Sequence, residues 1–241
     1  MIRIGIITAQ RKGGVDTLSP MLRSMQFGDP IAQSPYSQVG VFADEESIVI
    51  QEPWVNHIET RGKEELASLR AGKYFGSANL ARALRWAASE GAVVVASDDD
   101  FLVAQGWLSL SICLLEKAKA LGIFNPVIAL GHFYNGVDAF NRTEIYHNGV
   151  SLWSASPRTR SNGIFPVVMY PEVALAIAPL AEDKYLRNEQ DYAILEACRA
   201  DRVGTLLYTD PCLSMHMNMA SHFVPATWDS RLLDTKRFRG A

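Results

Sequence analysis

Three consecutive aspartates, Asp98, Asp99 and Asp100, follow the apolar, mostly β-branched run 93–96 after a single serine. A short run of this kind after a glycine is typical of a buried strand. Side chains just after such a strand lie where open α/β sheets bind ligands. Because adjacent carboxylates repel one another, a divalent cation such as Mg²⁺ or Mn²⁺ would stabilise the cluster. The triplet therefore predicts a cation site completed by substrate phosphates, with a solvated acidic turn as the simpler alternative.

The composition is that of a folded and nearly neutral protein. The chain has 241 residues, of which 48% are apolar, and a formal net charge of −3. These values predict a sizeable core and argue against a general electrostatic surface for nucleic acid. The three cysteines contain no CxxC pair, so neither a zinc cluster nor a disulfide scaffold is indicated. Without a signal-peptide pattern or a sufficiently long apolar stretch, we expect a cytoplasmic protein with no transmembrane segment.

Hydrophobic periodicity predicts the elements that position the aspartates. The opening order of strand, helix and strand is typical of a βαβ unit and a parallel sheet. We expect 48–65 to be mostly loop with a short strand, 133–162 to be irregular, and a tail carrying His216 to begin at Pro211. The expected strands are 2–8, 39–44, 93–96, 126–130, 165–170 and 203–208, and the expected helices are 18–25, 78–89, 107–121, 171–180 and 189–200.

The run 93–100, followed by Gly106 and Trp107, resembles the Asp-x-Asp region of nucleotide-sugar glycosyltransferases of the GT-A fold. In that family the acids hold a cation on the sugar-nucleotide diphosphate. Further segments resemble that family in the same order, and together they cover the chain from about residue 4 to residue 221. They are the first strand and helix (6–24), the second strand with its terminal acid (41–44), the helix beside the donor (76–84), the acceptor-site stretch (163–172), the acid-bearing helix start (189–191) and the C-terminal histidine segment (208–216).

The resemblance implies an α/β fold that is GT-A-like, or Rossmann-like, with a central mostly parallel sheet flanked by helices. It implies one domain over 1–241, with a nucleotide-sugar donor half at 1–130 and an acceptor half with a C-terminal tail at 131–241. The implied activity is metal-dependent transfer of a sugar to an acceptor hydroxyl.

The resemblance also implies a cofactor and roles for individual residues. The cation would be Mn²⁺ or Mg²⁺, held by Asp98, Asp100 and His216, and a UDP-sugar is the expected donor. The register leaves open whether Asp98 or Asp99 pairs with Asp100. In an inverting mechanism Asp191 or Glu189 would be the general base, whereas a retaining enzyme would need no base there. The residues expected to bind the donor are Thr8, Ala9, Arg11, Asp44, Asn79, Arg82 and Asp99.

Several ordinary roles compete with these assignments. Asp44 could cap a turn, Asn79 could begin a helix, and Arg82 could be a solvated helix residue. Glu189 and Asp191 could stabilise the dipole of the helix that they begin.

Two other functions fit parts of the sequence. A nucleotidyltransferase that makes nucleotide sugars would carry a glycine-rich, basic phosphate loop after the first strand, and 10–14 satisfies this in part. A non-catalytic module could bind Ca²⁺ through the aspartates. The acceptor stays open among a glycan, a lipid-linked glycan, a protein and a modified DNA base, the last because basic residues occur between 231 and 239.

Overall fold

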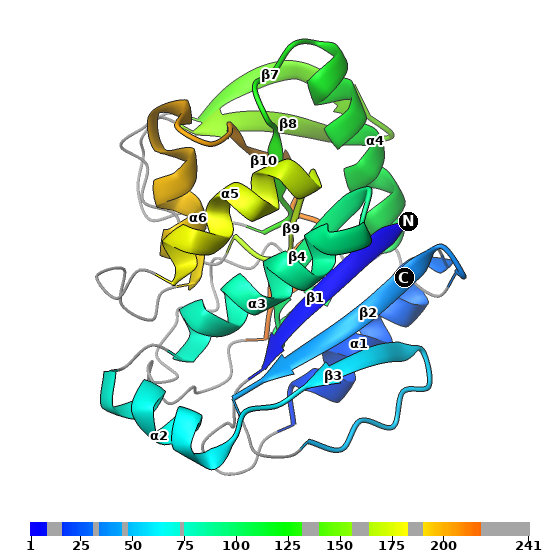
Figure 1. Cartoon of the computed structure of the whole chain (residues 1–241). Coiled ribbons are helices and arrows are strands. Elements are labelled where there is room, and N and C mark those ends of the chain that lie inside the picture. Colours follow the sequence, from blue (N-terminus) through cyan, green and yellow to red (C-terminus); the bar gives the residue numbers. More distant parts are fainter. Residues whose placement is uncertain are drawn as a thin grey trace.

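The computed structural model describes residues 1–8, 16–30, 34–44, 48–72, 75–131, 140–155, 164–182 and 190–217. These residues form a large twisted sheet with helices on both faces (Figure 1). The helices are α1 (Leu18–Gly28), α2 (Lys63–Gly72), α3 (Phe75–Glu90), α4 (Trp107–Ala120), α5 (Pro171–Ala181) and α6 (Gln190–Cys198). The strands are β1 (Ile2–Thr8), β2 (Ser37–Ala43), β3 (Val55–Glu59), β4 (Val93–Asp98), β5 (Phe101–Val103), β6 (Val127–Ala129), β7 (Phe140–His147), β8 (Val150–Ala155), β9 (Val167–Met169), β10 (Leu206–Asp210) and β11 (Ser214–His216).

The main sheet has nine strands in the order β3-β2-β1-β4-β9-β6-β10-β8-β7. Strands β3, β2, β1 and β4 are mutually parallel, and β6 and β10 are parallel to each other. Strand β9 is antiparallel to both neighbours, β4 and β6, and β8 is antiparallel to β10 and β7. Within the described residues, every strand of this sheet except β9 and β8 therefore points the same way. The predicted α/β fold with a mostly parallel sheet is confirmed.

Alternating side chains on the strands build a core on each face of the sheet. Along β4, Val94 and Ala96 pack into the core beneath α3, α5 and α6, whereas Val95 packs into the core beneath α1 and α4. Helix α3 can lie close to β1 because Gly5 has no side chain. A Cβ at this position would come within 2.9 Å of the Ala83 Cβ. This close packing holds the middle of α3 against the middle of β1.

Most predicted elements are confirmed, and the differences lie in the short or weakly patterned segments. Helix α2 begins at the end of the stretch 48–65, for which we expected mostly loop, and continues through residues for which no element was predicted. A β7–β8 hairpin lies within the stretch expected to be irregular. The expectation that His216 lies in a tail is wrong, because it ends β11, which pairs with β5 in a separate two-stranded sheet. None of the helices in the described ranges is long and apolar enough to cross a membrane.

Candidate functional site

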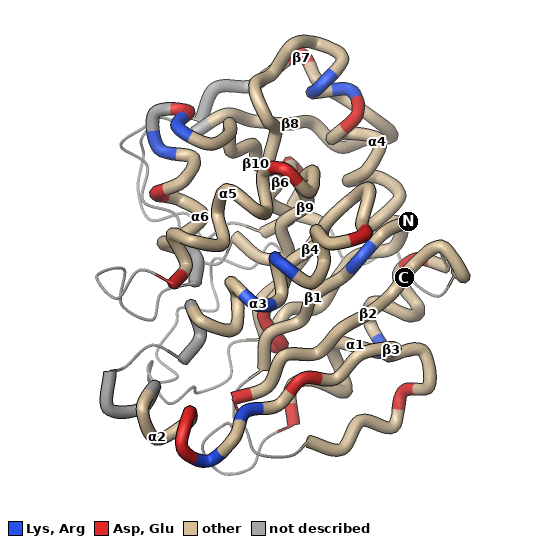
Figure 2. Tube along the Cα trace, viewed as in Figure 1, with Lys and Arg blue, Asp and Glu red and all other residues tan. Residues whose placement is uncertain are grey.

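The candidate site lies at the carboxyl ends of β1, β2 and β4. Strand β1 pairs with β2 on one side and with β4 on the other. The strands after β1 are therefore added first on one side of it and then on the other, so the strand order reverses at β1. Open α/β sheets bind ligands at such a point, outside the carboxyl ends of the strands. The pairing places Thr8 beside Ala43 and Ile7 beside Asp98. Figure 2 shows acidic residues at these strand ends.

Asp99 faces the protein interior, where two hydroxyl groups hold its carboxylate. Thr8 Oγ1 donates to Asp99 Oδ2 over 2.6 Å, and Thr17 Oγ1 donates to the same oxygen over 3.0 Å. Asp99 is 2% exposed. Thr17 precedes α1, but its hydroxyl is directed to Asp99 instead of capping that helix. Two residues expected to bind the donor, Thr8 and Asp99, thus contact each other and anchor the turn between Asp98 and Asp100.

Asp100, which directly precedes β5, and His216, which ends β11, lie side by side at one end of the small β5–β11 sheet. The His216 Nε2 and Asp100 Oδ2 atoms are 3.0 Å apart, and the Met217 backbone N–H donates to the Asp100 carbonyl over 2.7 Å. The His216 ring packs edge-on against Phe101, with 5.0 Å between ring centroids. Two of the three expected metal ligands are therefore brought together by strands more than 100 residues apart in the sequence.

The donor atoms of Asp100 and His216 suit Mn²⁺, which accepts carboxylate and imidazole ligands. Asp98 ends β4 and is half-buried. Among the residues in the described ranges, no three His, Cys, Asp or Glu side chains form a group that could hold a metal ion. The arrangement fits a cation held by one or two protein side chains and completed by substrate phosphates, not a cage of protein ligands.

Asp44, which follows β2, is buried with one carboxylate oxygen engaged. Its Oδ1 accepts a hydrogen bond from Asn79 Nδ2 over 2.7 Å and lies 3.4 Å from Arg61 Nε. Its Oδ2 is buried and has no hydrogen-bond partner within the described part of the chain. Burial raises the pKa of Asp44 from 3.8 to about 6, although the positive charges of Arg61 and Arg82 lower it. A buried acceptor without a partner is costly, so this oxygen is a candidate for contact with a ligand.

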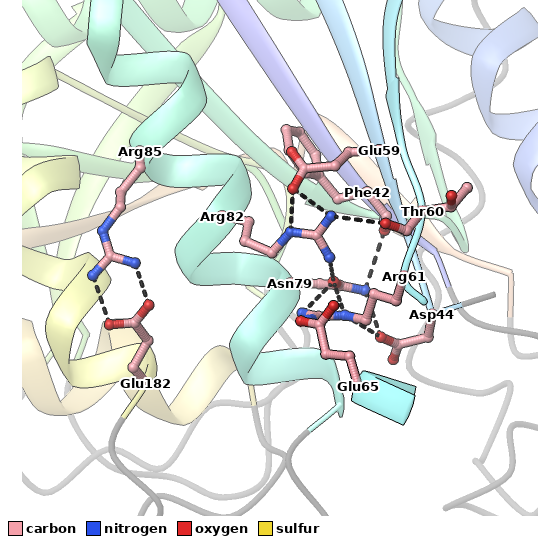
Figure 3. A network of polar contacts seen from close by, with 10 residues as sticks. All are labelled: Phe42, Asp44, Glu59, Thr60, Arg61, Glu65, Asn79, Arg82, Arg85 and Glu182. Carbon is pink, nitrogen blue, oxygen red and sulfur yellow. Dashed lines mark hydrogen bonds and ion pairs between the residues drawn. The ribbon is translucent and has the colours of Figure 1, made fainter. Parts of the chain in front are cut away.

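Asn79 connects the charged groups around Asp44 (Figure 3). It is fully buried near the start of α3, and its carbonyl accepts hydrogen bonds from Arg61 Nε, Arg61 Nη2 and Arg82 Nη1 over 3.0, 2.7 and 3.1 Å. Arg82 also donates to Glu59 over 2.6 Å. Asp44, Asn79 and Arg82, which the sequence assigned to donor binding, thus form one network, in which Arg82 bonds to protein groups.

Arg61 is the member of this network that the sequence did not indicate. It lies between β3 and α2 in the polar stretch 59–65, where an arginine is normally solvated. Its side chain is nevertheless only 2% exposed and also contacts the Glu65 carboxylate. The glycine directly after it was the one local sequence feature that could indicate a fixed position, because the helix that starts two residues later was not predicted.

Four expected site residues cannot be placed in this geometry. Ala9, Arg11 and Glu189 lie outside the described residues. Asp191 is the second residue of α6, but its side chain is not among those described. The assignment of Asp191 or Glu189 as general base therefore stays a prediction.

Comparison with known proteins indicates the fold alone. No protein-family model and no curated protein matches the sequence. Similar solved structures include GalNAc-T7 with UDP, GalNAc and Mn²⁺ (12% identity over 91% of this chain, TM-score 0.50) and S. aureus TarS 1–349 in complex with UDP (10% over 86%, TM-score 0.49). A third is 4-diphosphocytidyl-2C-methyl-D-erythritol synthase from Anaerococcus prevotii (13% over 87%, TM-score 0.40).

The likeness to GalNAc-T7 agrees with the predicted GT-A-like fold. This chain covers 44% of the GalNAc-T7 chain and 57% of the TarS chain, so it spans less than two thirds of either. It covers 88% of the Anaerococcus prevotii synthase. At such low identity these similarities concern the fold, and any assignment of chemistry depends on the residues of this chain.

Proposed function

We propose that this protein is a glycosyltransferase that transfers a sugar from a UDP-sugar to an acceptor hydroxyl. One observation carries the proposal: Thr8 links the buried acid that has an unused oxygen to the acidic triplet. The Asp44 backbone N–H donates to the Thr8 carbonyl over 3.0 Å, and the Thr8 hydroxyl donates to Asp99 over 2.6 Å. A nucleotide diphosphate requires one group that binds its base and another that binds its diphosphate. Asp44 and the acidic triplet would be these two groups, and Thr8 joins them at the carboxyl ends of the strands.

The nucleobase would contact Asp44. Its Oδ2 is one buried acceptor, and the ring N–H of uracil is one donor. A base that presents a single donor satisfies this oxygen, so a uridine nucleotide fits best.

The diphosphate would lie next to Asp98, Asp100 and His216, and one or two of these side chains together with the phosphates would hold Mn²⁺ or Mg²⁺. When bound, the cation neutralises the charge that develops on the leaving diphosphate. Asp99 serves this group indirectly, because its two threonine contacts fix the turn on which Asp98 and Asp100 lie.

Asp191 or Glu189 would accept the proton of the attacking hydroxyl in an inverting reaction. A general base contributes about 10²–10⁴-fold to the rate, so Asp191→Asn should reduce turnover by that order if Asp191 is the base. UDP-sugar binding should change little in this variant, because the base acts on the acceptor.

The direct test is thermal unfolding with UDP-sugars in the presence and absence of Mn²⁺. A ligand that binds the folded state raises the melting temperature, and we expect the rise to need the metal. Asp100→Asn and His216→Ala should remove the metal-dependent part. His147→Ala is the matched control, because His147 ends β7 at the far edge of the sheet and should leave the shift unchanged.

Product analysis distinguishes this proposal from its rival. A glycosyltransferase releases free UDP from the UDP-sugar, whereas a nucleotidyltransferase forms or consumes pyrophosphate. If no UDP-sugar shifts the melting temperature with Mn²⁺ present, the proposal is wrong.

A further inference from the structure

The buried guanidinium of Arg61 controls which oxygen of Asp44 is available. Arg61 Nε lies 3.4 Å from Asp44 Oδ1, and Asn79 Nδ2 donates to the same oxygen over 2.7 Å. Both contacts are with Oδ1, and none within the described residues is with Oδ2. The network therefore directs one oxygen of the carboxylate toward the protein and leaves the other as an unused acceptor (Figure 3).

Arg61 also determines the orientation of the Asn79 amide. Two N–H groups of Arg61 donate to the Asn79 carbonyl over 3.0 and 2.7 Å, so the amide nitrogen must face Asp44. The opposite orientation would place the NH₂ group against a guanidinium and the carbonyl against a carboxylate. Without Arg61, the contacts left in the described residues to hold this orientation, apart from Asp44 itself, would be the 3.1 Å bond from Arg82 to the Asn79 carbonyl and the 3.3 Å bond from Asn79 Nδ2 to the Phe42 carbonyl.

Within the described residues, the charged groups around Asp44 belong to β3, to α3, and to α2 with the residues just before it. Arg61 precedes α2, Asn79 and Arg82 lie on α3, and the acids that pair with the two arginines are Glu65 on α2 and Glu59 on β3. Burial raises the pKa of Asp44 to about 6, and Arg61 is the largest influence that lowers it. With Arg61 present, the carboxyl is mainly ionised at neutral pH; without Arg61, its pKa would rise further and the neutral form would become more populated.

We propose that Arg61 determines the base specificity of this site, because its contacts with Asp44 Oδ1 and with the Asn79 carbonyl leave Asp44 Oδ2 as the acceptor for the ring N–H of uracil. This inference rests on the proposed function, since it requires that a nucleotide binds at Asp44. Arg61 acts through Asp44 and Asn79 and is therefore a positioning residue.

The two pyrimidines differ where the free oxygen would meet them. Uracil presents a ring N–H, which an ionised carboxylate accepts. Cytosine presents a ring nitrogen lone pair at the same position, which an ionised carboxylate repels and a protonated carboxyl would bind. The 4-amino group of cytosine could donate to the carboxylate only if the base shifted from the position that uracil takes. A site built for one partner leaves buried groups unpaired with the other, which gives strong discrimination. The charge on Asp44 therefore decides between the two bases.

The experiment measures the dissociation constants of UDP and CDP by calorimetry with Mn²⁺ present. The ratio of the two is the readout, because the diphosphate and the metal are common to both. We expect wild type to prefer UDP by about tenfold or more at neutral pH. Arg61→Met should reduce that preference by about tenfold or reverse it, and Arg61→Lys should restore most of it. Arg85→Met is the matched control, because Arg85 is also an ion-paired arginine near this network, on α3, but it pairs with Glu182 outside the network.

A second arm uses the wild-type protein and does not depend on a variant that folds. Between about pH 7.5 and about pH 5.5 the preference for UDP should decrease as Asp44 takes up a proton. If Arg61→Met folds and keeps the wild-type ratio, or if the wild-type ratio does not change over this pH range, the role of Arg61 is refuted while UDP binding stands. If wild type binds neither nucleotide, the proposed function itself fails.

Discussion

Replacement of Asp44 by asparagine should stabilise the protein at neutral pH. Burial raises the pKa of Asp44 from its ordinary value of 3.8 to about 6. The folded state therefore binds more protons than the unfolded state between these two values, and the free energy of unfolding decreases as the pH rises through them. The difference corresponds to about 3 kcal/mol of stability that is present below pH 3.8 and lost above about pH 6.

An asparagine carries no charge and fills nearly the same volume, so Asp44→Asn should recover up to about 3 kcal/mol at about pH 7. One effect opposes this gain, because removal of one partner of a buried ion pair costs about 3–5 kcal/mol when the other charge is left alone. Arg61 is not left alone, since it keeps two hydrogen bonds to Asn79 and its contact with Glu65. The raised pKa of Asp44 already includes the attraction of Arg61, so burial destabilises the charged carboxylate by more than Arg61 stabilises it.

The assay is urea and thermal unfolding of wild type and variant at several pH values. For a chain of this size we expect the melting temperature to rise by roughly 6–12 °C at about pH 7, with the difference disappearing toward about pH 4. Asp201→Asn is the control, because Asp201 is exposed and its positive φ of 52° is one that asparagine also tolerates. A variant that is less stable than wild type by more than about 1 kcal/mol at neutral pH would show that the ion pair outweighs burial, and would refute the reasoning.

Three further substitutions test packing and anchoring by their effect on the free energy of unfolding. Gly40→Ala should cost about 1–3 kcal/mol, because the new Cβ would lie 2.9 Å from the Trp86 ring; an unchanged urea midpoint would contradict this packing. Asp29→Ala should cost about 1 kcal/mol, since the Asp29 carboxylate accepts the Ser109 N–H at the start of α4 over 2.7 Å; equal melting temperatures for variant and wild type would exclude this cap. Asp99→Ala should cost about 1–3 kcal/mol and weaken Mn²⁺-dependent UDP binding, because it leaves two threonine hydroxyls without their acceptor; stability and binding like those of wild type would show that Asp99 anchors nothing.

Local patterns were sufficient to predict the part of the fold that surrounds β1. Buried parallel strands are continuous apolar runs, and α1, α3 and α4 have apolar positions at helical spacing, so each element is visible in its own residues. Strands β5 and β11 are three residues long and gain their hydrogen bonds from each other across the sequence. No local pattern reports such a pairing, which is why His216 was expected in a tail.

The site was predictable to the extent that it follows strand ends. Asp44 and Asp98 each follow or end an apolar run, so their position at one sheet edge could be expected from the parallel order of the strands. The direction of a side chain in a turn could not be predicted from the sequence. Asp99 was expected to bind the donor, whereas its carboxylate points inward to Thr8 and Thr17. Arg61 was missed because the sequence of a polar stretch does not show which charge will be buried.

The position of β9 has a consequence for how the protein is made. This strand lies between β4 and β6, although it follows both in the sequence. A nascent chain that has reached Gly131 contains β4 and β6 but not the strand that joins them. The backbone N–H and C=O groups of β4 and β6 that pair with β9 would then be unpaired, and such strand edges tend to pair with other chains. Synthesis of residues 167–169 closes the gap, so we expect translation that stalls before β9 to yield aggregation-prone fragments instead of a smaller folded protein.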